Sequence, residues 1–152
     1  MLVTTQVYLR RDGQTLMLFR NKKEHDLNEG KWIGVGGKKC FGETPYECAV
    51  RETYEETHYL IRTARLCGIV TFCDDDYEEM MFIYISDDFT GEMSDCNEGT
   101  LSWIDNDQLL DLPMWEADPH FIKWLDEKKL YSAKAIYHRG SLVNYEERVE
   151  VE

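Results

Sequence analysis

The chain has 152 residues, and its 17 lysines and arginines against 30 aspartates and glutamates give a formal net charge of −13. A chain of about 150 residues can bury roughly two-thirds of its unfolded surface in one core, so we expect a single domain over residues 1–152. The acidity argues against polymeric nucleic acid, which is bound mainly through lysine and arginine, and against an anionic membrane surface. It does not exclude a small phosphorylated ligand that arrives with a divalent cation.

The cysteines and the N-terminal residues indicate the compartment. Five cysteines without a C-x-x-C pair favour reduced thiols over a disulfide framework or a zinc site. Arg10, Arg11, Asp12 and Arg20 interrupt the first 20 residues, so no apolar run there suits export or a membrane span. We therefore expect a cytoplasmic protein.

The first third of the chain is expected to begin with a hairpin. Thr5–Leu9 and Thr15–Arg20 have strand character and flank a turn at Asp12-Gly13. The polar segment Asn21–Lys31 indicates a loop. Trp32–Gly37 is apolar and rich in glycine, which predicts a short strand that runs into a tight turn.

A helix is expected from Pro45 to about His58. Thr44 and Glu47 form a capping box, with proline at the first helical position. Apolar and small residues recur on one side at helical spacing, and these are Tyr46, Ala49, Val50, Thr53, Thr57 and Leu60.

The second half of the chain is expected to be mostly strand, with one further helix. The helix is the amphipathic segment Pro119–Lys129. The strands are Ala64–Phe72, Met80–Ser86, Thr100–Ile104 and a closing hairpin of Tyr131–Tyr137 and Leu142–Val149 around Arg139-Gly140. Strands interleaved with two helices predict an α/β or α+β fold.

Three carboxylates lie on the outer side of the first helix. Glu52, Glu55 and Glu56 fall within an arc of about 100°, because positions i+3 and i+4 share a face. Several hard oxygen ligands suit Mg²⁺ or Mn²⁺ far better than zinc. The alternative is a solvated acidic face, but Arg51 alone cannot balance the charge.

A glycine-rich segment precedes that helix. Glycines let the backbone approach a ligand closely, and exposed N–H groups beside a lysine can hold phosphate oxygens. The pattern is neither a P-loop nor a dinucleotide fingerprint, so a simple tight turn is the alternative. The residues concerned are Gly34, Gly36, Gly37 and Gly42 around Lys38 and Lys39.

Taken together, the two segments strongly resemble the signature of the Nudix hydrolases, G-x5-E-x7-R-E-U-x-E-E-x-G-U, in which U is bulky and aliphatic. The glycine and charged positions all match, and they are Gly37, Glu43, Arg51, Glu52, Glu55 and Glu56. His58 stands where the family has glycine, and Thr53 and Tyr59 stand at the U positions. A glycine there would end the helix in the left-handed conformation, so the departure concerns the exit turn.

The resemblance implies a Nudix-type α/β/α sandwich with a mixed β-sheet. It also implies a chemistry in which box carboxylates bind Mg²⁺, with Mn²⁺ as the alternative, and water attacks a diphosphate. Carried over to this sequence, Glu55 and Glu56 would be metal ligands, Glu52 a ligand or the base that activates water, and Arg51 the residue that orients them.

The resemblance extends to further site residues. A backbone carbonyl of Gly36 or Gly37 would complete the metal site, and Glu98 is the best match for a family ligand on a later loop. Lys23 and Lys38 are candidate phosphate contacts, although each has the alternative of an ordinary surface lysine.

Two segments outside the box resemble the MutT-type members, which hydrolyse 8-oxo-dGTP. One is Trp32–Lys38, although Ile33 replaces an asparagine that some members use to contact the base. The other is Leu112–Asp118, where Trp115 would stack on a purine and Asp118 would hydrogen bond to its edge. The alternative for Trp115 is a residue that caps the core.

The leading hypothesis is a Mg²⁺-dependent diphosphatase that converts 8-oxo-dGTP or a related oxidised purine triphosphate to the monophosphate and pyrophosphate, a DNA-repair role. One alternative is a dinucleoside polyphosphate hydrolase, since Tyr77 lies near the position of a tyrosine in such enzymes. Another is a non-catalytic module that binds nucleotides. The sequence does not distinguish a monomer from a homodimer.

Overall fold

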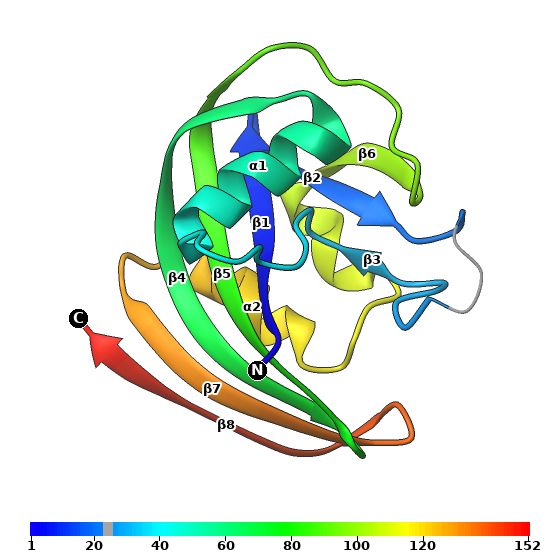
Figure 1. The fold of residues 1–152 in the computed structure, drawn as a ribbon, viewed down its shortest axis with the longest axis vertical. Helices are drawn as coiled ribbons and strands as arrows, with labels where there is room; N and C mark the ends of the chain where they lie inside the picture. Colours follow the sequence, from blue (N-terminus) through cyan, green and yellow to red (C-terminus); the bar gives the residue numbers. More distant parts are fainter. Residues whose placement is uncertain (23–25) are drawn as a thin grey trace.

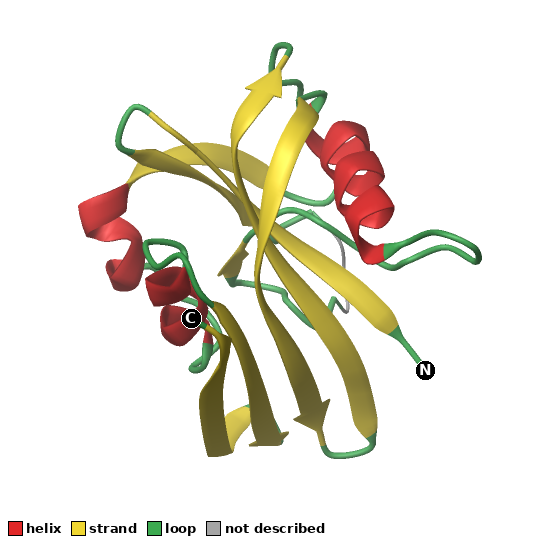
Figure 2. Ribbon diagram, turned by 90° about the vertical axis from the view of Figure 1, so that its left-hand side faces the viewer, coloured by secondary structure: helices red, strands yellow, loops and turns green. Residues whose placement is uncertain are grey.

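The computed structural model describes residues 1–22 and 26–152, and its centre is a mixed eight-stranded sheet with helices on both sides (Figures 1 and 2). The strands are β1 (Val3–Arg11), β2 (Gln14–Phe19), β3 (Trp32–Ile33), β4 (Leu60–Asp74), β5 (Tyr77–Thr90), β6 (Thr100–Asp105), β7 (Leu130–His138) and β8 (Ser141–Val151). The helices are α1 (Pro45–Thr57), the 3₁₀ helix η1 (Asn106–Asp111) and α2 (Asp118–Trp124). The predicted α/β/α sandwich is confirmed.

The sheet has the strand order β3-β2-β1-β5-β4-β7-β8, and β6 pairs with β2. The pairs β1–β5 and β4–β7 are parallel, and the remaining pairs are antiparallel. The first strand of the chain therefore lies in the interior of the sheet, where its alternate side chains reach both faces.

The predicted start and end of α1 are confirmed. The Thr44 side chain accepts the Glu47 N–H, and the Glu47 carboxylate accepts the Thr44 N–H, so both halves of the capping box are formed. Ala49 and Thr53 are fully buried under the helix. His58 ends it with φ 66°, in the left-handed conformation that the family's glycine would provide.

The predicted strand Trp32–Gly37 is only partly regular. β3 pairs with β2 for two residues, and the chain then moves to the edge of β1 through bridges at Val35 and Lys38. Gly36 causes the break, because it has φ 141° and a Cβ there would lie 2.1 Å from the Thr5 carbonyl oxygen. The backbone of this turn therefore runs directly along β1.

The long β4–β5 hairpin extends beyond the predicted strands. β4 pairs with β5 from Leu60↔Thr90 to Asp74↔Tyr77, with irregular register between Ile61 and Gly68. Those irregularities break the alternation of apolar residues, which hid the first part of the strand in the sequence. α2 ends at Trp124 instead of Lys129, because the chain turns there to enter β7.

The described part of the chain contains no helix that is both long and apolar enough to cross a membrane.

Candidate active site

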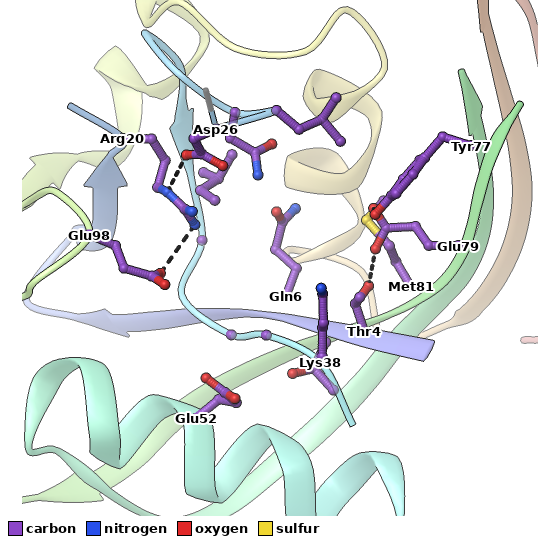
Figure 3. Close-up of a pocket in the computed structure, with 17 residues that line it drawn as sticks. Thr4, Gln6, Arg20, Asp26, Lys38, Glu52, Tyr77, Glu79, Met81 and Glu98 are labelled. Atoms are coloured by element: carbon purple, nitrogen blue, oxygen red, sulfur yellow. Dashed lines mark hydrogen bonds and ion pairs between the residues drawn. The ribbon is translucent and has the colours of Figure 1, made fainter. Parts of the chain in front are cut away.

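A cavity of about 490 Å³ lies beside α1, where β1, β5 and the glycine-rich turn meet. Figure 3 shows Arg20, Asp26 and Glu98 on one side of it and Tyr77, Glu79 and Met81 on the other. Its lining residues come from segments far apart in the sequence, and they are Thr4, Thr5, Gln6, Arg20, Asp26, Leu27, Asn28, Ile33, Gly34, Gly36, Gly37, Lys38, Glu52, Tyr77, Glu79, Met81 and Glu98.

Arg51 organises the outer face of α1. Its guanidinium group donates to Glu43 at 2.6 and 3.0 Å, to Glu52 at 2.8 Å and to Glu55 at 3.2 Å. It also donates to the Lys38 carbonyl at 3.1 Å. The hydrogen bonds from Arg51 lower the pKa of Glu43 to about 2. One cation thus holds three carboxylates and the glycine-rich turn together.

Gly37 makes room for Glu52. A Cβ at position 37 would lie 2.6 Å from a carboxylate oxygen of Glu52, so only glycine lets this carboxylate pack against the turn. The Gly37 carbonyl already accepts the Thr5 N–H at 2.9 Å. Of the two glycine carbonyls predicted as metal ligands, Gly36 is therefore the better candidate.

Glu56 faces inward, unlike Glu52 and Glu55. It is 8% exposed, and one carboxylate oxygen accepts the Gly36 N–H at 2.9 Å. The other oxygen is buried and has no hydrogen-bond partner within residues 1–22 and 26–152. Burial, together with the charges of Glu98 and Glu52, raises the pKa of Glu56 to about 8 against the effect of the Gly36 N–H.

Glu98 is held by an ion pair on the opposite side of the cavity from β5. Arg20 lies 3.3 Å from Glu98 and 2.7 Å from Asp26, and Figure 3 shows the three side chains together. Arg20 and Asp26 are both nearly buried, so this pair is a fixed part of the wall. Neither was identified from the sequence.

These residues fit a divalent cation. Among the described residues, one buried oxygen of Glu56 has no partner, and the charges of Glu52 and Glu98 lie nearby, so a cation would find hard oxygen ligands here. Within residues 1–22 and 26–152, however, no three acidic, histidine or cysteine side chains already have ligating geometry. Glu52 forms an ion pair with Arg51, and Glu98 forms one with Arg20.

The candidate phosphate contacts have different outcomes. Lys38 is exposed and points into the cavity from the glycine-rich turn (Figure 3). This position suits a phosphate contact, which stays a prediction. Lys23 lies outside the described residues.

Trp115 and Asp118 lie behind the cavity wall. Trp115 is 6% exposed, packs edge-on against Phe72 and Tyr137, and has Lys31 over its ring, so it offers no open stacking face. Its indole N–H donates to Asn28, a lining residue, at 2.7 Å. These contacts are those expected of a tryptophan that caps the core, which was the alternative for Trp115.

Asp118 is 4% exposed and does not line the cavity. Burial raises its pKa to about 8, against the opposing charge of Lys31. The carboxylate lies close enough to Tyr8 to raise the pKa of its hydroxyl as well. Direct contact between Asp118 and a base stays a prediction.

Several residues that line the cavity were not predicted from the sequence, notably Thr4, Gln6 and Glu79. The signal that was available is the spacing of Thr4 and Gln6, two residues apart in the first strand, which places both on one face. Glu79 had no such signal, because it meets Thr4 only through the parallel pairing of β1 with β5.

Comparisons with known proteins agree with this arrangement. The NUDIX domain family matches residues 2–125. The chain is 33% identical over 127 residues to the uncharacterized Nudix hydrolase YvcI of Bacillus subtilis (strain 168). This match covers 80% of this chain and 77% of that protein. It is 30% identical over 129 residues to the oxidized purine nucleoside triphosphate hydrolase of Danio rerio, and this match covers 84% of this chain and 81% of that protein. A crystal structure of a MutT protein from Bacillus halodurans superimposes with a TM-score of 0.86 and 28% identity. The match covers 99% of this chain and 98% of that chain.

Proposed function

This chain belongs to the Nudix family of hydrolases, and we propose that it is a Mg²⁺-dependent diphosphatase that converts 8-oxo-dGTP or a related oxidised purine nucleoside triphosphate to the monophosphate and pyrophosphate. The substrate class is supported by the similarity to the Danio rerio hydrolase, and by 29% identity over 111 residues to its Mus musculus counterpart. The observation that carries the reaction type is the buried, unpaired oxygen of Glu56 beside Glu52 and Glu98.

The metal would be held by Glu52, Glu55, Glu56, Glu98 and the Gly36 carbonyl. Bound there, Mg²⁺ or Mn²⁺ supplies charge neutralisation for a triphosphate and lowers the pKa of a coordinated water. An acidic site can hold a polyanion only with such a cation between them.

The remaining box residues position these ligands and the substrate. Arg51 holds Glu52 and Glu55 in place, and Glu52 packs against Gly37 at the cavity rim, where it is a ligand or accepts the proton of the attacking water. Lys38 and Lys23 would contact phosphate oxygens. Removal of oxidised nucleotides from the cytoplasmic pool before their incorporation is the corresponding role in DNA repair.

A panel of nucleoside triphosphates, assayed with Mg²⁺ for pyrophosphate against phosphate release, tests this proposal. We expect pyrophosphate from 8-oxo-dGTP, with kcat/KM higher than for dGTP, and a loss of several orders of magnitude in kcat for Glu56→Gln with the fold retained. Release of inorganic phosphate alone, or no hydrolysis of any triphosphate, would contradict it.

The panel also covers the alternatives. Tyr77 lines the cavity, so diadenosine tetraphosphate is compared with 8-oxo-dGTP at equal concentration. A higher kcat/KM for the dinucleotide would favour the polyphosphate hydrolase. Nucleotide binding in a calorimeter without any hydrolysis would favour the non-catalytic module.

A further inference from the structure

The side of the cavity away from the box glutamates carries a carboxylate of its own, Glu79. In Figure 3, Glu79 and Glu98 lie on opposite sides of the cavity, with Gln6 between them. Glu79 is 9% exposed and lines the cavity from β5. Its two oxygens accept hydrogen bonds from the hydroxyls of Thr4 and Tyr77, the latter at 3.1 Å.

The described part of the chain gives Glu79 no ion-pair partner. Among residues 1–22 and 26–152, no lysine, arginine or histidine forms an ion pair with this carboxylate. A buried carboxylate that receives only two neutral hydroxyl bonds retains unused acceptor sites, since it has about four. A ligand with N–H donors would fill these sites and offset the cost of burial.

Gln6 adds a second acceptor to the cavity, between Glu79 and Glu98 in Figure 3. Its side-chain NH₂ group donates to the hydroxyl of the fully buried Tyr8 at 2.7 Å, which fixes the amide. The amide carbonyl oxygen is then the group available to a ligand in the cavity. Gln6 follows Thr4 by two residues on β1, so both face the same side of the sheet, roughly 7 Å apart along the strand.

The two acceptors discriminate between purines. A guanine-type edge presents N1–H and the 2-amino group side by side, and one carboxylate can accept from both. An adenine-type edge places the N1 lone pair next to its amino group, and that lone pair repels a carboxylate. Oxidation at C8 also converts N7 from an acceptor into an N–H donor, which a carbonyl oxygen can accept.

We propose that Glu79 and the carbonyl oxygen of Gln6 form the base-reading end of this cavity, with Glu79 selecting 2-amino-6-oxopurines and Gln6 selecting the N7–H of their 8-oxo forms. This assignment rests on the proposed function for the identity of the ligand, and it locates base selection on β1 and β5. It also explains how a base can be read although Ile33 provides no polar group and Trp115 and Asp118 lie behind the wall.

The test uses nucleoside monophosphates, whose binding does not require hydrolysis. Dissociation constants for 8-oxo-dGMP, dGMP and dAMP are measured by calorimetry on the full chain and on Glu79→Gln, Gln6→Met and Glu78→Gln. Glu78 is the matched control, because it is the exposed neighbour of Glu79 and contacts Cys73 instead of the cavity. Thermal melting of each variant establishes that it is folded.

We expect Glu79→Gln to reduce the preference for dGMP over dAMP by about 10- to 100-fold. Gln6→Met should instead reduce the preference for 8-oxo-dGMP over dGMP and leave the guanine preference intact. Glu78→Gln should bind all three ligands like the unmodified chain. If Glu79→Gln does not fold, the Gln6→Met result decides.

Unaltered base preferences in Glu79→Gln and Gln6→Met, or no guanine preference in the unmodified chain, would overturn the assignment. The triphosphate assay separates this outcome from failure of the proposed function. Selective binding of 8-oxo-dGMP without triphosphate hydrolysis would refute the diphosphatase and leave the base-reading end in place. Hydrolysis with unchanged base preference in both variants would support the diphosphatase and overturn the assignment of Glu79 and Gln6.

Discussion

The guanidinium group of Arg51 binds both carboxylate oxygens of Glu43, at 2.6 and 3.0 Å, and so joins the middle of α1 to the loop before it. A planar fork can make this bidentate contact and still reach Glu52 with its remaining nitrogen. The position of the box carboxylates therefore depends on the shape of the cation as well as on its charge.

Arg51→Lys should keep the charge and lose this geometry. We expect kcat for the oxidised triphosphate to fall by roughly 10- to 100-fold, because lysine cannot hold Glu43 and Glu52 at the same time. Steady-state kinetics and a melting curve measure the two effects separately. A kcat close to that of the unmodified chain would show that charge alone is sufficient, and the exposed Glu92→Gln serves as control.

Mg²⁺ should stabilise the folded chain, since it relieves the repulsion among Glu52, Glu56 and Glu98. A ligand that binds only the folded state raises the melting temperature with concentration. We expect that rise in the unmodified chain and a much smaller one in Glu56→Gln, which should be at least as stable without metal. An equal rise in both proteins would remove Glu56 from the set of metal ligands.

Alanine at Gly36 and at Gly37 should have different effects. Gly36→Ala places a Cβ against the Thr5 carbonyl oxygen at a backbone φ of 141°, so we expect a loss of stability of about 2 kcal/mol or more. At Gly37→Ala the atoms nearest the new Cβ belong to the flexible Glu52 side chain, so the fold should persist while kcat/KM falls. Urea denaturation together with kinetics distinguishes the two, and equal loss of stability in both would contradict this prediction.

Asp118 should make stability depend on pH. Burial raises its pKa from 3.8 to about 8, so the folded state holds this proton more tightly than the unfolded state. Its contribution is complete below about pH 4 and is lost as pH rises toward 8, by at most about 1.4 kcal/mol per pH unit. Asp118→Asn should reduce the change of the urea midpoint with pH between pH 5 and 8. The control Asp87→Asn, at an exposed position, should leave that pH dependence as it is in the unmodified chain.

His58→Gly should stabilise the end of α1. The left-handed conformation at φ 66° costs a residue with a Cβ about 1 kcal/mol, and glycine adopts it freely. We expect a higher urea midpoint and unchanged kinetics. His58 stacks on Tyr54, so an unchanged or lower midpoint would mean that this contact outweighs the backbone strain.

The half of the site that depends on local sequence was predictable, and the other half was not. The capping box at Thr44 and Glu47 and the carboxylates of α1 are separated by one to three helical turns, so their relation follows from helix geometry. Glu79 meets Thr4 only because two distant strands pair in a particular register, and a shift by one residue would turn either side chain to the other face. No local pattern specifies that register.

The same distinction applies to Trp115 and Asp118, whose segment resembled the base-binding segment of the MutT-type members. The resemblance identified the segment, but the burial of both side chains depends on tertiary packing, such as that of Trp115 against Phe72 and Tyr137, which no motif encodes.

The parallel pairing of β1 with β5 also orders the steps by which the chain folds. Val3 pairs with Met80 and Leu9 with Ser86, and closing so long a loop is slow because its entropic cost precedes any reward from contacts. Helix α1 needs no such closure for its capping box. During synthesis, the two walls of the cavity can meet only after β5 has left the ribosome. A nascent chain therefore has the candidate metal-binding carboxylates of α1 before it has a place for a base.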